Sequence, residues 1–534
     1  MTTTDRASQG EQSPSRNPHR SAHPGLALLI ITGTQLMIVL DATIVNIALP
    51  SMARYFDKTQ TDMTWAINAY TLAFGGLLLL GGKAGDILGR RRMFMVGLGL
   101  FTIGSFLGGI SWNFQVLMVG RVIQGIGGAI SSPTALALIT TEFDEGPERT
   151  RALAAFSAVA GAGAALGLML GGILTDVLSW RWVLFVNVPI GVMLVVGAYF
   201  YLHESDRLQG KFDYLGGVTS TVGMTSLVYA FIHAAQHGWG NGETIGAFVI
   251  AGVLLGFFVY WQARLGEEAM MPLHVFKNRS RSGAYLVMLI IGAAMFGMFY
   301  FLTFFVQQNL HYSPLKSGFA FLPVALTIGV SAQLAAVGLK RFGPRNLIVA
   351  GSLIMTAGLV WLATISDTSK YSTHILPSMI VMAFGIGMIF VPLMTVVVSG
   401  VEPHEAGLAS ALLNVGQQVG GSIGLSVLAT VAATASRSET TEQIGKITSM
   451  NNPQILQHFQ ELGRQQTDAN FAASAAAKAD SVANHAMSVI GAHAAASGFL
   501  AAAIMAVIAV LVGLGMIRTS KEDIANIDPA VAMH

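Results

Sequence analysis

Runs of apolar residues recur along the whole chain, and shorter polar segments separate them. A helix needs about 20 apolar residues to cross the roughly 30 Å hydrocarbon core of a bilayer. Fourteen runs come close to or exceed this length. The hydrophobic pattern therefore predicts an all-α integral membrane protein with fourteen spans, at 25–49, 64–81, 93–111, 114–140, 152–175, 182–202, 214–235, 244–263, 283–308, 317–338, 346–365, 374–399, 406–433 and 491–516.

Basic residues are distributed unevenly over the connecting segments, and this predicts the orientation of the spans. If the N-terminus lies inside, most Lys and Arg residues of the short segments fall on the inner side and few on the outer side. Cytoplasmic loops carry such an excess. We expect a multi-pass protein of the cell's cytoplasmic membrane with both termini in the cytoplasm, as tails at 1–24 and 518–534.

The spans fall into three groups along the chain. Charged connectors at 203–213 and 264–282 bracket two spans, so that segment 203–282 separates a first set of six spans at 25–202 from a last set of six at 283–433 and 491–517. The segment 434–490 is polar and long, and we expect it outside the membrane. It reads as a solvated helical cap, with helix-like stretches near 453–465 and 471–488; a role in substrate access is the alternative.

Composition narrows the possible functions. Hydrophobic residues make up 53% of the chain and charged residues 11%, against about 25% charged residues in soluble domains. A net charge of +2 gives no reason to expect a nucleic-acid partner, and the absence of cysteine excludes disulfides and thiol chemistry. The first 24 residues contain no apolar run, so we expect a cytoplasmic tail and not a cleavable signal peptide.

Two charged residues fall well inside the predicted spans. Asp41 lies roughly 13 Å from the outer end of its helix and Arg121 roughly 11 Å from the outer end of its own, at a rise of about 1.5 Å per residue. Both therefore lie in one layer of the outer half of the membrane. Charges in a bilayer are costly and mark function by default, so we favour proton or substrate handling over a purely structural ion pair.

The segment between the spans 64–81 and 93–111 contains Gly82, Asp86, Gly89 and Arg90, followed by two more arginines. The composition predicts a tight cytoplasmic turn with a basic end, whose arginines could serve only to fix topology. A degraded copy of this pattern, without the aspartate, occurs at 338–345. A loop repeated at corresponding places in two sets of six helices indicates internal duplication.

Three further segments carry recognisable patterns, at 40–50, 121–128 and 180–191. Together with the loop at 82–92, they resemble the major facilitator superfamily, and in particular its branch of fourteen-helix drug:proton antiporters. The resemblance implies a fold of two six-helix bundles plus two inserted helices, with alternating access to a central cavity. It also implies small lipophilic, often cationic, substrates, protons as the driving ion and a chain that functions as a monomer; the oligomeric state itself stays open.

The resemblance also suggests roles for individual residues. Asp41 would exchange a proton with the outside and attract a cationic substrate, while Arg121 would change the proton affinity of Asp41 as the two approach or separate. Asp86 would face the N-terminus of a neighbouring helix and pair with an arginine. We therefore assign a conformational latch on the cytoplasmic side to Asp86, Arg90, Gly82 and Gly89.

One predicted span departs from the antiporter pattern. Gly163, Gly167 and Gly171, followed by Gly172, repeat along one face of the span 152–175, where a neighbouring backbone can approach closely. Leu168 stands where the antiporter signature has a proline. The glycine face is intact and the kink element is missing, which leaves a same-fold uptake carrier or symporter as an alternative.

Polar residues elsewhere in the spans are candidates for the lining of a cavity. On a helix, Gln124 shares a face with Arg121. The others are Asn46 in the first span and a polar face of Asn414, Gln417 and Gln418 in the span 406–433. Polar contacts that hold helices together are an equally simple interpretation. We take His233 and His237 as incidental.

The sequence argues against other classes of function. It has no phosphate-binding loop, no cluster with metal-ligand spacing and no nucleophile–base arrangement. We therefore expect a protein that is not an enzyme and uses no cofactor. Proton-coupled export is the favoured function, uptake or symport the alternative, and a membrane receptor that does not transport a remote third possibility.

Overall fold

The computed structural model describes residues 23–143, 147–204, 212–266, 269–399, 406–449 and 481–519. Within these residues the chain is helical throughout and contains no strand. The elements of the first part are α1 Pro24–Phe56, α2 Gln60–Leu88, α3 Arg90–Gly109, α4 Phe114–Glu142, α5 Pro147–Ile173, η1 Leu174–Leu178, α6 Trp182–Phe185 and α7 Asn187–Tyr201. They are followed by α8 Tyr214–His237, α9 Gly242–Leu265, η3 Leu273–Phe276, α10 Arg279–Phe304, η4 Phe305–Asn309, α11 Pro314–Phe342, α12 Pro344–Leu362, η5 Tyr371–Ile375, α13 Leu376–Val398, α14 Ala406–Ser449 and α17 Ser481–Met516.

The predicted fold class is confirmed. Thirteen helices among the described residues are long and apolar enough to cross a membrane, and the stretch Leu166–Leu178 at the end of α5 is a shorter apolar helix. Each of the fourteen predicted spans lies on one of these helices, with α6 and α7 together forming the sixth.

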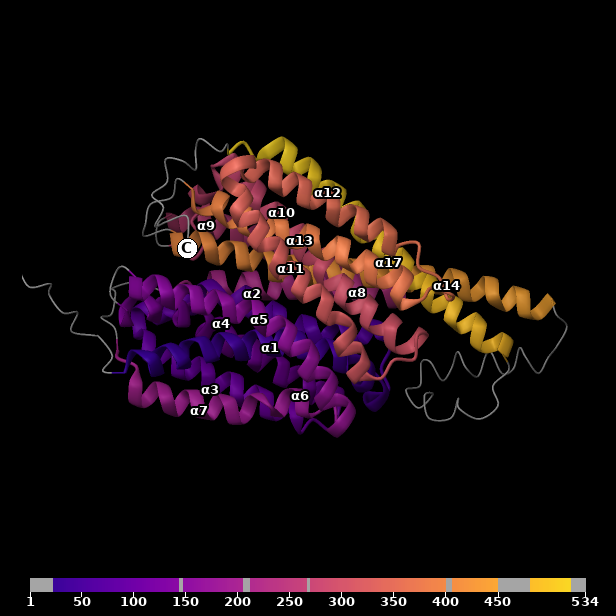
Figure 1. Ribbon diagram of the computed structural model, residues 1–534, viewed down its shortest axis with the longest axis horizontal. Helices are drawn as coiled ribbons and strands as arrows, with labels where there is room; N and C mark the ends of the chain where they lie inside the picture. Colours follow the sequence, from indigo (N-terminus) through magenta and orange to yellow (C-terminus); the bar gives the residue numbers. More distant parts are fainter. Residues whose placement is uncertain are drawn as a thin grey trace, which may run out of the picture.

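The helices form two bundles with a hairpin beside them (Figure 1). In the first bundle, α2 and α3 both pack against α4, and α1 packs against α5. In the second bundle, α10 packs against α14, and α12 and α11 both pack against α13. The hairpin of α8 and α9 contacts both bundles, because α8 packs against α2 and α14.

The two bundles repeat one turn in detail. Gly89 joins α2 to α3 with a φ of +109°, and Gly343 joins α11 to α12 with a φ of +74°. Two residues after each glycine, an arginine reaches the last helix of its own bundle: Arg91 Nε donates to the carbonyl of Ala198 at 3.2 Å, and Arg345 Nη2 donates to that of Leu514 at 2.8 Å. Duplicated loops in equivalent positions are typical of transporters built from internal repeats.

We call the end of the molecule that carries these two turns the basic end. The opposite end is the projecting end, because α14 and α17 extend beyond the other helices there (Figure 1). The helix α14 continues to Ser449, beyond residue 433, where the predicted span ends. Side-chain pairs one helical turn apart, such as Glu442–Lys446 at 2.7 Å, support this polar continuation.

The segment predicted as a long loop is therefore partly an extension of two helices. It begins within α14, and it ends within α17, which starts at Ser481 and not at 491. The predicted helix-like stretch 453–465 and most of 471–488 lie outside the described residues, as do most of the two predicted tails.

Candidate transport site

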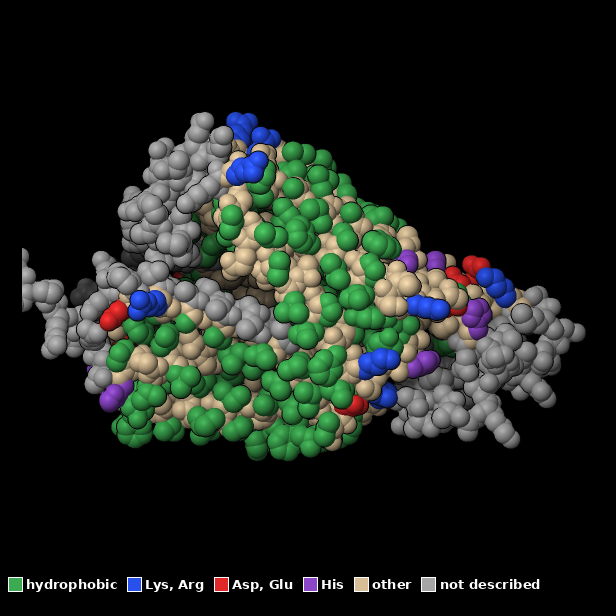
Figure 2. Space-filling view, viewed as in Figure 1, with side chains coloured by type: hydrophobic (Ala, Val, Ile, Leu, Met, Phe, Trp, Pro, Cys, Tyr) green, Lys and Arg blue, Asp and Glu red, His purple; other side chains and the backbone are tan. Residues whose placement is uncertain are grey.

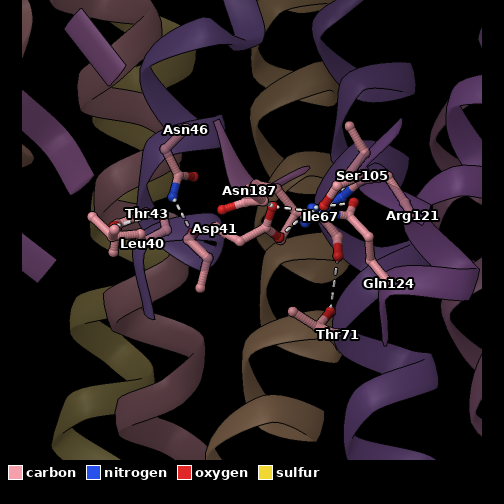
Figure 3. A network of polar contacts seen from close by, with 12 residues as sticks. Leu40, Asp41, Thr43, Asn46, Ile67, Thr71, Ser105, Arg121, Gln124 and Asn187 are labelled. Carbon is pink, nitrogen blue, oxygen red and sulfur yellow. Dashed lines mark hydrogen bonds and ion pairs between the residues drawn. The ribbon is translucent and has the colours of Figure 1, made fainter. Parts of the chain in front are cut away.

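Asp41 is the centre of a buried polar cluster in the first bundle (Figure 3). Its side chain is 0% exposed and lies in the middle of α1. Its Oδ2 accepts a hydrogen bond from Arg121 Nη1 at 2.5 Å, which is also the ion pair of the site. Its Oδ1 accepts from Gln124 Nε2 and from Asn187 Nδ2, each at 2.9 Å. Three donors from two other helices thus hold the carboxylate.

Arg121 on α4 is equally enclosed, with 2% of its side chain exposed. Its Nε donates to the carbonyl of Ala66 on α2 at 2.8 Å, and its Nη1 also donates to Gln124 Oε1 at 3.1 Å. The guanidinium lies 4.5 Å from the centre of the Tyr70 ring. A buried guanidinium needs such partners, because desolvation of an unpaired charge is very costly.

Close packing of α2 on α4 makes these contacts possible. A Cβ atom at Gly125 would lie 2.5 Å from the carbonyl oxygen of Tyr70, so the two backbones can meet here only at a residue without a side chain. This contact is one turn away from Arg121 and brings its Nε to the backbone of α2. Gln124, in turn, donates to Ser105 on α3 at 2.6 Å, so that α1, α2, α3, α4 and α7 all contribute to one cluster.

The structure brings together Asp41, Arg121 and Gln124, which were three of the predicted site residues. It adds Asn187 and Ser105 as direct partners in the cluster. Asn187 stood inside one of the patterns that carried the resemblance, but no spacing rule pointed from it to Asp41. Ser105 gave no signal, because a serine in an apolar span most often bonds within its own helix.

The other predicted cavity residues lie away from this cluster. Asn46 donates to the carbonyl of Ala42 in its own helix at 3.0 Å. Asn414 is exposed, and Gln417 and Gln418 are half-buried on α14. Gln418 lies where α14 meets α2, since a Cβ atom added at Gly75 of α2 would be 3.2 Å from the Cβ atom of Gln418. Of these residues, Gln418 therefore borders the interface of the bundles, and none of the hydrogen bonds described for Asp41 involves any of them.

The predicted latch lies at the basic end. Asp86 Oδ1 accepts from Arg90 Nη2 at 2.9 Å, and Arg90 Nη1 donates to the carbonyl of Ala137 on α4 at 3.3 Å. A second carboxylate, that of Glu204, lies at the N-terminus of α3 and accepts from the backbone N–H groups of Arg91 and Arg92, at 3.0 and 3.1 Å. The segment before α14 lies outside the described residues.

The two latch glycines have different surroundings. A Cβ atom at Gly89 would lie 2.6 Å from Glu204 Oε1, and its positive φ disfavours any other residue. A Cβ atom at Gly82 would meet Pro133 at 3.5 Å, an ordinary contact distance.

The glycine face of α5 packs against two helices from different bundles. Gly163, Gly167 and Gly171 face α1, where a Cβ atom at Gly171 would come within 2.7 Å of the carbonyl oxygen of Ile44. Gly172 faces α11, where the corresponding distance to the carbonyl oxygen of Pro314 is also 2.7 Å. Leu168, which replaces the signature proline, presents its backbone carbonyl to Gly318 of α11. The face thus forms part of the contact between the bundles.

Hydrogen bonds between the bundles cluster toward the projecting end. Gln60, the first residue of α2, donates from Nε2 to Gln308 Oε1 at 2.6 Å, and Asn68, about two turns further along α2, donates from Nδ2 to Ser426 Oγ at 3.1 Å. Gln307 Nε2 donates to the carbonyl of Ile47 at 2.9 Å. Toward the basic end the bundles diverge (Figure 1), and the surface is hollowed between them (Figure 2). The bundles are therefore closed at the projecting end and open at the basic end.

Comparison with known proteins places this architecture in a family. The model of the Major Facilitator Superfamily matches residues 31–425. The puromycin resistance protein pur8 of Streptomyces alboniger is 42% identical over 76% of this chain and 82% of its own. The cephamycin export protein CmcT of Amycolatopsis lactamdurans is 37% identical over 78% of this chain and 86% of its own.

A solved structure has the same fold. A bacterial homologue of the human lysosomal transporter Spinster, crystallised in an inward-facing and unoccupied conformation, superposes with a TM-score of 0.65 at 15% identity and covers 95% of this chain and 99% of its own. Given the family match across most of the sequence and relatives of this identity, the chain belongs to the major facilitator superfamily and is a multi-pass membrane transporter, not an enzyme.

Proposed function

We propose that this transporter is a drug:proton antiporter that exports small lipophilic, often cationic, compounds from the cytoplasm. The observation that carries the proposal is the buried Asp41–Arg121 pair, at 0% and 2% exposure, inside a helix bundle that otherwise buries few charges. The names of two relatives, which record puromycin resistance and cephamycin export, support export of small molecules. We place the basic end in the cytoplasm, because basic residues gather there.

Alternating access gives the buried pair a role in coupling. In the state described here, which is open at the basic end, Arg121, Gln124 and Asn187 all donate to the Asp41 carboxylate. We take the exchange of the coupled proton at Asp41 to require that the carboxylate and the guanidinium separate. Opening toward the projecting end would separate the pair, load the proton and release the exported compound.

The Asp86–Arg90 pair fits a latch that acts in the opposite state. Here Arg90 pairs with Asp86 and donates to the carbonyl of Ala137, both in the first bundle, while the bundles are apart at the basic end. When the basic end closes, this part of the first bundle meets the second bundle. The pair then contributes to the balance between the two states.

Proton release from purified protein tests the proposal directly. Addition of ethidium, a lipophilic cation, should release protons from the wild type and none from Asp41→Asn, which keeps the size of the side chain and removes its titration. Asp176→Asn, at an exposed carboxylate near the projecting end, is the matched control and should behave as the wild type. Unchanged release from Asp41→Asn would place the coupling site elsewhere.

Symport is the second candidate, because Leu168 stands where the antiporter signature has proline. Vesicles with an imposed pH gradient separate the two. Antiport predicts that the compound moves against the proton flow, and symport predicts that it moves with it.

A further inference from the structure

Asn187 is the partner of Asp41 that the coupling scheme leaves unexplained. It is the first residue of α7, directly after the break that separates α6 from α7, and its side chain is 0% exposed. Its Nδ2 donates to Asp41 Oδ1 at 2.9 Å, while its own Oδ1 is buried and has no hydrogen-bond partner among the residues that the structure describes. Buried acceptors are nearly always paired, so this oxygen points to a donor that arrives in another state of the site.

A protonated Asp41 would be that donor. A carboxylate only accepts hydrogen bonds, whereas a carboxylic acid also has an O–H to donate. The primary amide of asparagine carries both a donor and an acceptor, and a half-turn about its last torsion exchanges their positions. Asn187 can therefore pair with Asp41 before and after the proton binds.

Gln124, the other amide of the cluster, has no such freedom. Its Oε1 accepts from Arg121 Nη1 at 3.1 Å, and its Nε2 donates to Ser105 Oγ at 2.6 Å as well as to Asp41. A half-turn of this amide would point its NH₂ group at the guanidinium and break both contacts. The amide that can follow the protonation of Asp41 is the one on α7.

We propose that Asn187 is a positioning residue for proton exchange, which donates to the Asp41 carboxylate and accepts from the Asp41 acid, and so sets the pH at which the proton is released. This inference rests on the proposed function, since it takes Asp41 as the site of the coupled proton. The other groups that face Asp41 are Arg121 from α4, Gln124 from the same helix, and Tyr70 from α2, whose ring lies against Arg121. From α5, the uncharged residues Gly163 and Gly167 lie against this stretch of α1.

Ethidium-induced proton release, measured as a function of pH on the purified full-length protein, tests the inference. Asn187→Leu keeps the approximate volume of the side chain and removes the donor to the carboxylate. The variant also removes the acceptor for the acid, but a hydrogen bond to a charged group is stronger than one to a neutral group, so we expect the midpoint of proton release to move upward by about 1 pH unit. Thr34→Val, which removes a buried hydrogen bond of α1 to its own backbone at 3.0 Å, should leave the midpoint unchanged.

A second pair of variants keeps the test valid if the leucine variant is poorly folded. Asn187→Thr and Asn187→Val have the same shape and differ in one hydroxyl, which can donate and accept. The threonine variant should have the lower midpoint of the two. Equal midpoints in this pair, or an unshifted midpoint in Asn187→Leu, would overturn the role of Asn187. Asp41→Asn tests the proposed function separately. If Asp41→Asn loses proton release while the Asn187 variants keep the wild-type midpoint, the Asn187 inference alone is rejected.

Discussion

At the scale of single residues, the Asp41–Arg121 pair buries two opposite charges side by side. Each charge is expensive to bury, and each is offset by the other together with neutral donors and acceptors. The pair is therefore tolerated as a unit, while either half alone is not. This asymmetry separates the effect of a substitution on folding from its effect on transport.

Arg121→Ala should lose both transport and stability. It leaves the Asp41 carboxylate buried without its cation, a change that typically costs about 3–5 kcal/mol. The double variant Asp41→Asn with Arg121→Gln removes both charges and should recover most of the stability, yet remain unable to couple protons. Thermal unfolding in detergent and vesicle transport measure the two effects. A double variant no more stable than Arg121→Ala would show that the unpaired Asp41 carboxylate does not cause the loss of stability in Arg121→Ala.

The sequence could place this pair only in part. Depth along two helices put Asp41 and Arg121 in one layer, because the rise per residue is fixed. It could not supply the rotation of α7, which decides that Asn187 and not a neighbouring residue reaches Asp41. Contacts between helices far apart in sequence depend on packing that no single helix encodes.

At the scale of elements, the turns at Gly89 and Gly343 fix how neighbouring helices are joined. Glu204 lies against the start of α3 and accepts from two backbone N–H groups there, which the positive end of the helix favours. The sequence analysis did not single out Glu204, which it treated only as part of the charged connector 203–213. A loop signature identifies the turn but not every group that faces it.

Gly89→Ala should destabilise the protein by more than about 1 kcal/mol, because it forces a positive φ on a residue with a Cβ and crowds Glu204. Gly329→Ala, on α11 with no atom within 4 Å of the added Cβ, is the control and should be neutral or slightly stabilising. The unfolding temperatures of the purified variants give the comparison; equal values would mean that the turn accommodates a side chain.

Asp86→Asn should slow transport without reducing the amount of protein in the membrane. The Asp86–Arg90 pair is partly exposed, with 38% and 22% of the side chains accessible, and such a pair contributes about 1 kcal/mol or less to stability. A change of this size shifts a balanced equilibrium between two states several-fold. Transport rate per inserted molecule is the measurement, and a wild-type rate would remove Asp86 from the latch.

The extended ends of α14 and α17 change the prediction for the segment 434–490. Glu439 and Gln443 on α14 are buried, and Asn309 donates to the carbonyl of Ser488 on α17 at 2.7 Å. We expect that replacing only 450–480 with a flexible linker preserves transport. Replacing all of 434–490 removes these contacts and should lower the amount of inserted protein. Loss of transport in the shorter replacement, at normal insertion, would assign a direct role to 450–480.

At the scale of the whole molecule, the contacts between bundles define one conformational state. They gather toward the projecting end, from Ile47 and Gln60 to Ser426, while the basic end is open. The number and order of the spans followed from hydrophobicity alone, because the bilayer sets the length of each helix. The state of the transporter could not follow from it, since both states contain the same helices.

The chain contains no cysteine, so a single engineered pair can fix this state. Gln60→Cys with Gln308→Cys replaces a hydrogen bond of 2.6 Å between the bundles by a cross-link. Oxidation or a short bifunctional reagent should stop transport, and reduction should restore it; each single variant is the control. Continued turnover of the cross-linked protein would mean that the projecting end does not open during transport.

The paired arginines of the repeated turns have a consequence for biosynthesis. Arg91 donates a hydrogen bond to the final helix of the first bundle, and Arg345 donates one to the final helix of the second. Each of these contacts therefore stays within its own bundle. The first bundle can thus be completed in the bilayer while the ribosome is still translating the second. Severing the polypeptide in the hairpin region and supplying the two pieces as separate genes should accordingly yield halves that mature independently and then assemble.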